Sequence, residues 1–104
     1  MPYKIVVYVP LENADEVRRA IGEAGGGKLG KYSFCSFSTR GTGRFKPEEG
    51  ANPHIGSVGK IELVEEEKIE FVCQKNALEN VIAAIKKVHP YEEVAFDVYK
   101  LADW

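Results

Sequence analysis

The chain has 104 residues, enough for one domain with a single hydrophobic core and too few for two domains of ordinary size. Its 14 basic and 16 acidic residues give a net charge of −2, which argues against a nucleic-acid-binding protein. No apolar run approaches the roughly 20 residues of a membrane span, and the first run is too short for a signal peptide. Its two isolated cysteines, Cys35 and Cys73, form no CxxC motif, so we expect a cytoplasmic protein in which both are small core residues.

The first part of the chain is predicted to fold as a strand, a helix and a second strand. Residues 5–9 are a β-branched run, and Asn13 then begins, as an N-cap, a segment with apolar side chains at helical spacing. Three glycines at residues 25–27 end the helix, because glycine readily adopts the left-handed backbone of a helix cap. The match of residues 25–30 to G-x-G-x-x-G follows a helix instead of a strand, so it indicates a cap and turn. The second strand is predicted over residues 32–38.

Residues 39–59 are predicted to form a long irregular arm, because five glycines and two prolines interrupt regular structure there. A tight turn is expected at residues 41–43, with residues 44–46 returning along the arm. A connection of about 20 residues is well above the usual loop length, which is typical of a functional or interface loop.

The second part repeats the pattern of the first. Residues 58–73 are too long for one regular strand, and the break in apolar alternation at residues 65–67 predicts a bulge or bend, with the acidic run there facing solvent. A second helix is expected to start at Asn76 and to end at His89, because Pro90 cannot continue it; a strand over residues 94–99 follows. Two strand–helix–strand units predict one ferredoxin-like α+β domain over residues 1–104, with a four-stranded antiparallel sheet and two helices on one face.

The other face of that sheet would then carry more aromatic side chains than two helices on the first face can cover. An exposed apolar face of this size usually marks an interface, so the sequence predicts self-association. The residues expected on this face are Tyr8, Phe34, Phe37, Phe96 and Tyr99.

The corner between the second helix and the last strand is the best candidate for ligand contact. His89, Tyr91, Glu92 and Glu93 place an imidazole, a phenol and two carboxylates within five residues. His89 with Glu92 or Glu93 could supply part of a divalent metal site, completed by a neighbouring subunit. The alternative is that His89 caps the helix end while Tyr91 packs against the sheet. Adjacent glutamates in an extended segment point to opposite sides, so one of the two would serve any single site.

The arm is the second candidate, since it could form a pocket for a small anion such as phosphate. Arg40, Thr42, Arg44 and His54 are its expected contact residues, with Lys28 and Lys31 nearby, and glycine turns can add backbone N–H donors. The alternative is a solvated loop.

Three spaced motifs resemble one family over essentially the whole chain. Residues 41–47, 50–56 and 89–93 look like the inserted domain of the YqfO-type, Nif-three-like proteins, and Val94 stands where that family commonly has proline. The resemblance implies a domain similar to CutA and PII signalling proteins, which are trimers with ligand sites in clefts between subunits. In that family a larger outer module carries a dinuclear metal site, for which this sequence has no counterpart, so we expect the inserted domain occurring alone.

These observations predict a non-enzymatic ligand-binding or regulatory module that acts as a homo-oligomer, a trimer or else a dimer. No cofactor is required, although a divalent metal at His89 and Glu92 is an open alternative; neither nucleic acid nor membrane is an expected partner. Two rival hypotheses are a metal-dependent enzyme built across subunits around His89 with Glu92 or Glu93, and a docking module for a hydrolase of the same family.

Overall fold

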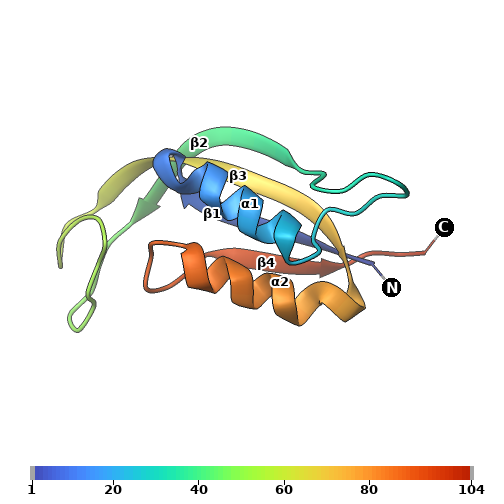
Figure 1. Ribbon diagram of the computed structural model, residues 1–104. Helices are drawn as coiled ribbons and strands as arrows, with labels where there is room; N and C mark the ends of the chain where they lie inside the picture. Colours follow the sequence, from blue (N-terminus) through green and yellow to red (C-terminus); the bar gives the residue numbers. More distant parts are fainter. Residues whose placement is uncertain (1, 104) are drawn as a thin grey trace.

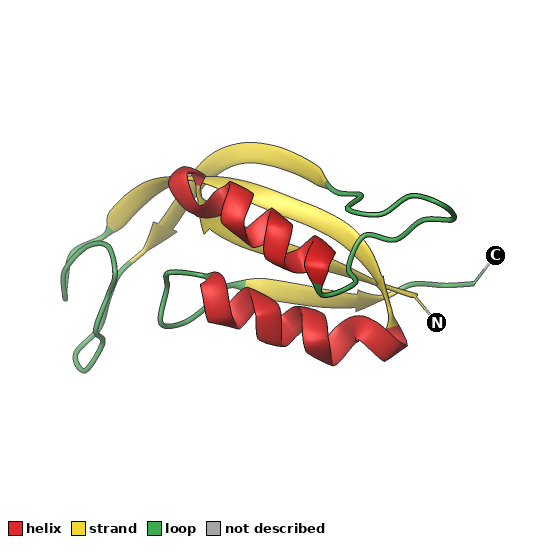
Figure 2. Ribbon diagram, viewed as in Figure 1, coloured by secondary structure: helices red, strands yellow, loops and turns green. Residues whose placement is uncertain are grey.

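The computed structural model of the protein describes residues 2–103 and shows one sheet covered by two helices (Figure 1). The elements in chain order are β1 (Pro2–Pro10), a short 3-10 helix η1 (Leu11–Asn13), α1 (Ala14–Glu23), β2 (Phe37–Phe45), β3 (Glu62–Gln74), α2 (Lys75–Val88) and β4 (Phe96–Lys100). The strands lie in the order β2-β3-β1-β4, each neighbouring pair is antiparallel, and both helices pack on the same face (Figure 2). The predicted ferredoxin-like fold is confirmed. No helix within residues 2–103 has the length and apolar character to cross a membrane.

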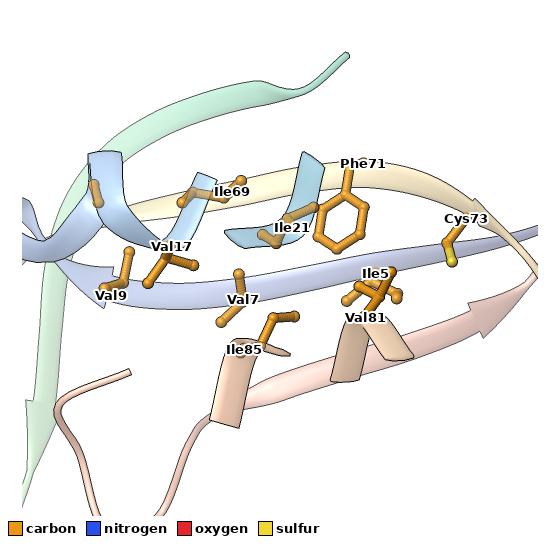
Figure 3. Packing of buried hydrophobic residues seen from close by; sticks show 11 residues of the cluster. Ile5, Val7, Val9, Val17, Ile21, Ile69, Phe71, Cys73, Val81 and Ile85 are labelled. Atoms are coloured by element: carbon orange, nitrogen blue, oxygen red, sulfur yellow. The ribbon is translucent and has the colours of Figure 1, made fainter. Parts of the chain in front are cut away.

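The core fills the layer between the sheet and the helices. Alternate residues of a strand point to the same face, so every second residue of β1 is directed at α1 and α2 (Figure 3). Each such aliphatic side chain stabilises the fold by about 1.5–3 kcal/mol when it is fully buried. The side chains that meet in this layer include Ile5, Val7 and Val9 from β1, Val17 and Ile21 from α1, Ile69 and Phe71 from β3, and Val81 and Ile85 from α2.

The end of α1 is closed by the predicted glycines, whereas the predicted N-caps differ. The Gly26 N–H donates to the Ile21 carbonyl at 2.9 Å and the Gly25 N–H to the Gly22 carbonyl at 3.2 Å, which is a Schellman cap with Gly25 at φ +102°. Asn13 flanks α1 but makes no side-chain cap hydrogen bond, because its own backbone is already helical, in η1. Asn76 lies inside the first turn of α2, which begins after Gln74, so the predicted cap there is wrong.

The middle strands differ from the sequence prediction. β2 starts only at Phe37 and runs through Gly41 and Gly43 to Phe45, so the predicted turn at residues 41–43 is wrong. β3 is one strand of 13 residues without a bulge, because it pairs with β2 over residues 62–70 and with β1 over residues 66–74 in unbroken registers. It curves instead of breaking (Figure 1). β4 begins at Phe96, two residues later than predicted.

The second face of the sheet is bare, as predicted, but with fewer aromatic residues. Phe37 is 68% exposed and Tyr99 is 53% exposed, on β2 and β4 respectively. Phe96 instead lies on the helix face, opposite Val7, and packs against the core. Phe34 lies in the loop before β2, beside Gly22 of α1. The predictions for Phe34 and Phe96 are therefore wrong. Phe34 precedes β2, and Phe96 lies three residues before Tyr99 in one strand, which places the two on opposite faces.

Candidate functional site

A cavity of about 690 Å³ lies where β2, the loop of residues 46–61 and the corner of residues 89–95 meet. Figure 1 shows this loop and this corner at the same end of the molecule. The cavity brings together residues that are far apart in the sequence, and all but one of the predicted contact residues line it. These are Arg40, Thr42, Arg44 and His54 from the predicted arm and Tyr91, Glu92 and Glu93 from the corner.

The loop of residues 46–61 is held by one hydrogen bond to the corner and one across its own base. The Asn52 N–H donates to Glu92 Oε1 at 2.8 Å, which joins the middle of the loop to the corner. The Gly59 N–H donates to the Pro47 carbonyl at 2.8 Å and closes the base of the loop. Glu92 is therefore a cavity-lining residue that is already engaged in positioning the loop.

Tyr91 is the centre of the site. Its ring lies edge-on to Phe45 of β2, with centroids 5.7 Å apart at an interplanar angle of 61°. The His54 and His89 rings lie on its other sides at 6.4 Å and 5.1 Å. Its hydroxyl donates to Glu66 Oε2 at 3.2 Å. Burial and the neighbouring Glu66 carboxylate raise the pKa of the Tyr91 phenol well above its usual range, so the phenol stays protonated and acts as a donor.

Glu66 of β3 is the residue that the sequence prediction missed. It was expected to face solvent within the acidic run, yet it is only 8% exposed and lines the cavity. Burial raises the pKa of its carboxyl group, and the hydrogen bond from Tyr91 partly opposes this rise. A Cβ atom on Gly43 would lie 1.9 Å from Glu66 Oε1, so this carboxylate depends on a glycine in the neighbouring strand. Glycine inside a strand often marks such a close approach, and it was the available signal.

His89 is held as a structural residue and does not line the cavity. It is 6% exposed; its Nε2 bonds the Tyr8 carbonyl at 2.7 Å, and its Nδ1 accepts the Tyr91 N–H at 3.2 Å. The proton is therefore on Nε2, and burial lowers the pKa of the imidazole. A metal bound by His89 would have to displace one of these two backbone bonds. Within residues 2–103, no group of three or more His, Cys, Asp and Glu side chains is placed to hold a metal ion.

The charged residues around the cavity are unevenly paired. Lys46 lies 3.8 Å from Glu48, and Thr42 Oγ1 donates to Glu65 Oε1 at 2.9 Å. Arg40, Arg44 and Lys68 also line the cavity, and none of these three forms an ion pair with another described residue. The cavity thus has a buried acid and cations without an ion pair to a described residue, and Glu48, Glu92 and Glu93 add further acidic residues to its lining.

The remaining polar residues singled out in the sequence lie elsewhere. Lys28 and Lys31 are exposed in the loop after α1 and do not line the cavity. Cys73 is buried in the core as predicted, and burial raises the pKa of its thiol, whereas Cys35 is half-buried in the loop before β2. Neither thiol belongs to the cavity lining.

The architecture is that of the CutA proteins. The chain matches a divalent cation tolerance protein CutA from Archaeoglobus fulgidus with a TM-score of 0.71, at 20% identity over all of this chain and 87% of that one. It also matches a PII-like protein CutA from Nostoc with a TM-score of 0.69, at 15% identity over 95% and 80% of the two chains. Identities this low show the fold alone. No family model matches the chain.

Sequence identity is higher with a group of longer proteins. The chain is 54% identical over 101 residues to a GTP cyclohydrolase 1 type 2 homolog from Halalkalibacterium halodurans and 53% identical over 96 residues to that from Bacillus subtilis. These two matches span 97% and 92% of this chain but only 27% and 26% of the two relatives. The structure of a Bacillus cereus protein related to NIF3 matches with a TM-score of 0.85 at 47% identity, over 98% of this chain and 26% of that one. The resemblance to the Nif-three-like family is thus confirmed, and the chain spans about a quarter of the length of these relatives.

Proposed function

We propose that the chain is a ligand-binding or regulatory module that performs no chemistry of its own. The observation that carries this proposal is the cavity of about 690 Å³, which lies within the range of ordinary small-molecule sites, about 300–1,000 Å³. Its lining combines aromatic rings with a few polar groups, which is the composition of a binding site. His89, the residue best suited to proton transfer, is tied to the backbone instead of facing the cavity.

The activity in the name of the curated relatives is not proposed for this segment, because the chain covers about a quarter of those proteins. A divalent metal held by His89 and Glu92 stays a prediction, as does docking to a hydrolase of the same family. The metal prediction has the weaker support, since Glu92 already accepts the Asn52 N–H. Self-association is part of the proposal, because the bare sheet face and the CutA-like fold both favour it.

The proposal is tested by thermal unfolding of the purified chain with a panel of small anions, nucleotides, amino acids and divalent metals. A compound present at roughly 100 times its Kd should stabilise the chain by about 2.7 kcal/mol and raise Tm by on the order of 10 °C. Arg44→Gln should reduce this shift, because Arg44 lines the cavity without an ion-pair partner.

The matched control is Arg19→Gln, which removes the same side chain from an exposed position on α1. It should leave the shift unchanged. A panel without any stabilising compound, or a shift that Arg44→Gln and Arg19→Gln affect equally, would contradict a binding role for the cavity.

A further inference from the structure

The buried carboxylate of Glu66 has capacity for a ligand. A carboxylate offers about four lone-pair positions, and Glu66 receives one hydrogen bond from the described residues, from Tyr91 to Oε2. Glu66 lies on β3 opposite Gly41, on the bare face of the sheet at the floor of the cavity. Burying a carboxylate is costly unless it is hydrogen-bonded, so a site with spare acceptor positions here favours a donor from outside the protein.

The sheet beside Glu66 is bare enough to receive a flat group. Gly41 and Gly43 alternate on the same face of β2 and carry no side chain, and a Cβ on Gly41 would meet nothing within 4 Å. The rings of Phe45 and Tyr91 border this area. Aromatic rings of this kind stack with flat bases and attract guanidinium groups.

A cation on the same face as Glu66 can hold an anionic group of the same molecule. Lys68 lines the cavity two residues from Glu66 on the same face of β3 and forms no ion pair within residues 2–103. Arg40 and Arg44 alternate with Gly41 and Gly43 and belong to the opposite face of β2. A compound with hydrogen-bond donors at one end and a negative charge at the other would satisfy both the buried acid and Lys68.

We propose that Glu66 recognises a planar pair of adjacent N–H donors on an anionic small molecule, whose negative group lies beside Lys68. A carboxylate binds such a pair in a two-pronged fashion, as it does an arginine side chain. Two kinds of molecule offer this chemistry, namely a guanine nucleotide and a free amino acid with a guanidinium group. The inference rests on the proposed binding function and names the chemical class that the cavity takes.

Isothermal titration calorimetry with four probes tests the proposal. Guanosine monophosphate is compared with inosine monophosphate, which lacks the exocyclic amino group, and L-arginine is compared with L-citrulline, which lacks the guanidinium charge. Both analogues keep the anionic tail. Inosine monophosphate loses the donor pair, whereas L-citrulline keeps two adjacent N–H donors and loses the positive charge that strengthens their bonds to a carboxylate. We expect one of the two donor-bearing probes to bind at least 10-fold more tightly than its matched analogue.

Glu66→Gln should weaken that binding by roughly 10- to 100-fold, because the side chain keeps its shape but loses its charge and one acceptor. Glu70→Gln is the control, since Glu70 lies on the same face of β3, pairs with Lys4 and does not line the cavity. Gly43→Ala is a second variant, which keeps the glutamate but moves its carboxylate. The added Cβ would displace Glu66 Oε1 and should weaken binding as well.

The proposal is overturned if neither guanosine monophosphate nor L-arginine binds. It is also overturned if each analogue binds as tightly as its donor-bearing partner, or if Glu66→Gln binds the probe as tightly as the wild type does. These results are separable from failure of the binding function. If another compound stabilises the chain in an Arg44-dependent manner, the cavity binds a ligand and only the assignment to Glu66 fails. If no compound of the panel binds, both fail together.

Discussion

His89 stabilises the corner by bonding two backbone groups that would otherwise be left without partners. Its Nε2–H satisfies the Tyr8 carbonyl on β1, and its Nδ1 accepts the N–H of Tyr91, which fixes the position of the Tyr91 ring beside the cavity. A buried carbonyl without its donor costs about 1–3 kcal/mol. His89 therefore acts on the site through Tyr91, as a positioning residue.

The pH dependence of stability should reveal this role. The pKa of His89 is lower in the folded state, so its stabilisation is present above the unfolded-state pKa of about 6.5 and is lost as pH falls below it. His89→Gln should lower the free energy of unfolding by about 1–3 kcal/mol at pH 8 and show a smaller loss between pH 7 and pH 5. Urea unfolding at a series of pH values measures both effects.

His54→Gln serves as the control, because it removes the other histidine but keeps burial, which is the main cause of the lowered pKa of His89, so most of the decline should remain. Glu66 acts in the opposite direction: its raised pKa favours the folded state at low pH, and that contribution is lost as pH rises above about 4.5. Glu66 is present in the wild type and in both histidine variants, so its contribution cancels when each variant is compared with the wild type at the same pH. Equal declines in the wild type and His89→Gln would contradict the assignment.

The role of a single residue can be predicted from the sequence when it depends on residues close to it in the chain. Tyr91 and Arg44 could be proposed because a helix-to-strand corner and a basic glycine-rich segment are visible locally. Glu66 could not, because its burial depends on the pairing of β3 with a strand about 25 residues earlier and on the space left by Gly43. The bond from His89 to the Tyr8 carbonyl likewise joins residues 81 positions apart.

The C-terminal end of a helix is predictable when its cap depends on neighbouring residues alone, as the end of α1 shows. Three glycines after an amphipathic segment specify a cap from nearest neighbours alone, and the Schellman hydrogen bonds confirm it. The glycines of β2 misled the prediction, since Gly41 and Gly43 resemble a turn locally. Pairing along nine residues of β3 outweighs that preference.

The cap of α1 can be tested by Gly25→Ala. A Cβ at this position would touch only Ala77 at an ordinary 3.5 Å, so the cost arises from the backbone, which has φ +102°. A left-handed backbone disfavours alanine by about 1–2 kcal/mol, and the resulting loss of Tm should be several degrees. Calorimetry measures it.

Gly41→Ala is the matched control for stability, because its φ is not positive and its Cβ would meet nothing within 4 Å. Its free energy of unfolding should stay within about 0.5 kcal/mol of the wild type. A loss of the same size in both variants would show that glycine at the end of α1 is not required by the cap.

The bare sheet face governs the behaviour of the whole molecule. Phe37, Val72 and Tyr99 are exposed on three different strands of this face, and the Lys4–Glu70 ion pair, 3.0 Å long, lies among them. Exposed apolar surface spread over several strands favours burial against another copy. We expect the purified chain to have the mass of a trimer, three times 11.6 kDa.

Phe37→Asp should convert this oligomer to a monomer, because a charge would then be buried between copies. Multi-angle light scattering gives the mass. Tyr32→Asp is the control: Tyr32 is 74% exposed but lies in the loop before β2, away from the sheet face. A wild-type mass of 11.6 kDa, or dissociation by both variants, would contradict self-association through this face.

The unequal lengths of β1 and β3 have a mechanical consequence. Residues 62–65 of β3 pair with β2 alone, because β1 ends opposite Glu66. One wall of the cavity is therefore a two-stranded ribbon, which is far less rigid than a strand flanked on both sides. The opposite wall is the corner anchored to β1 by His89. A ligand bound between this flexible wall and the fixed one would tilt the two-stranded part of β2 and β3. Binding would then change the shape of the surface that a neighbouring molecule contacts.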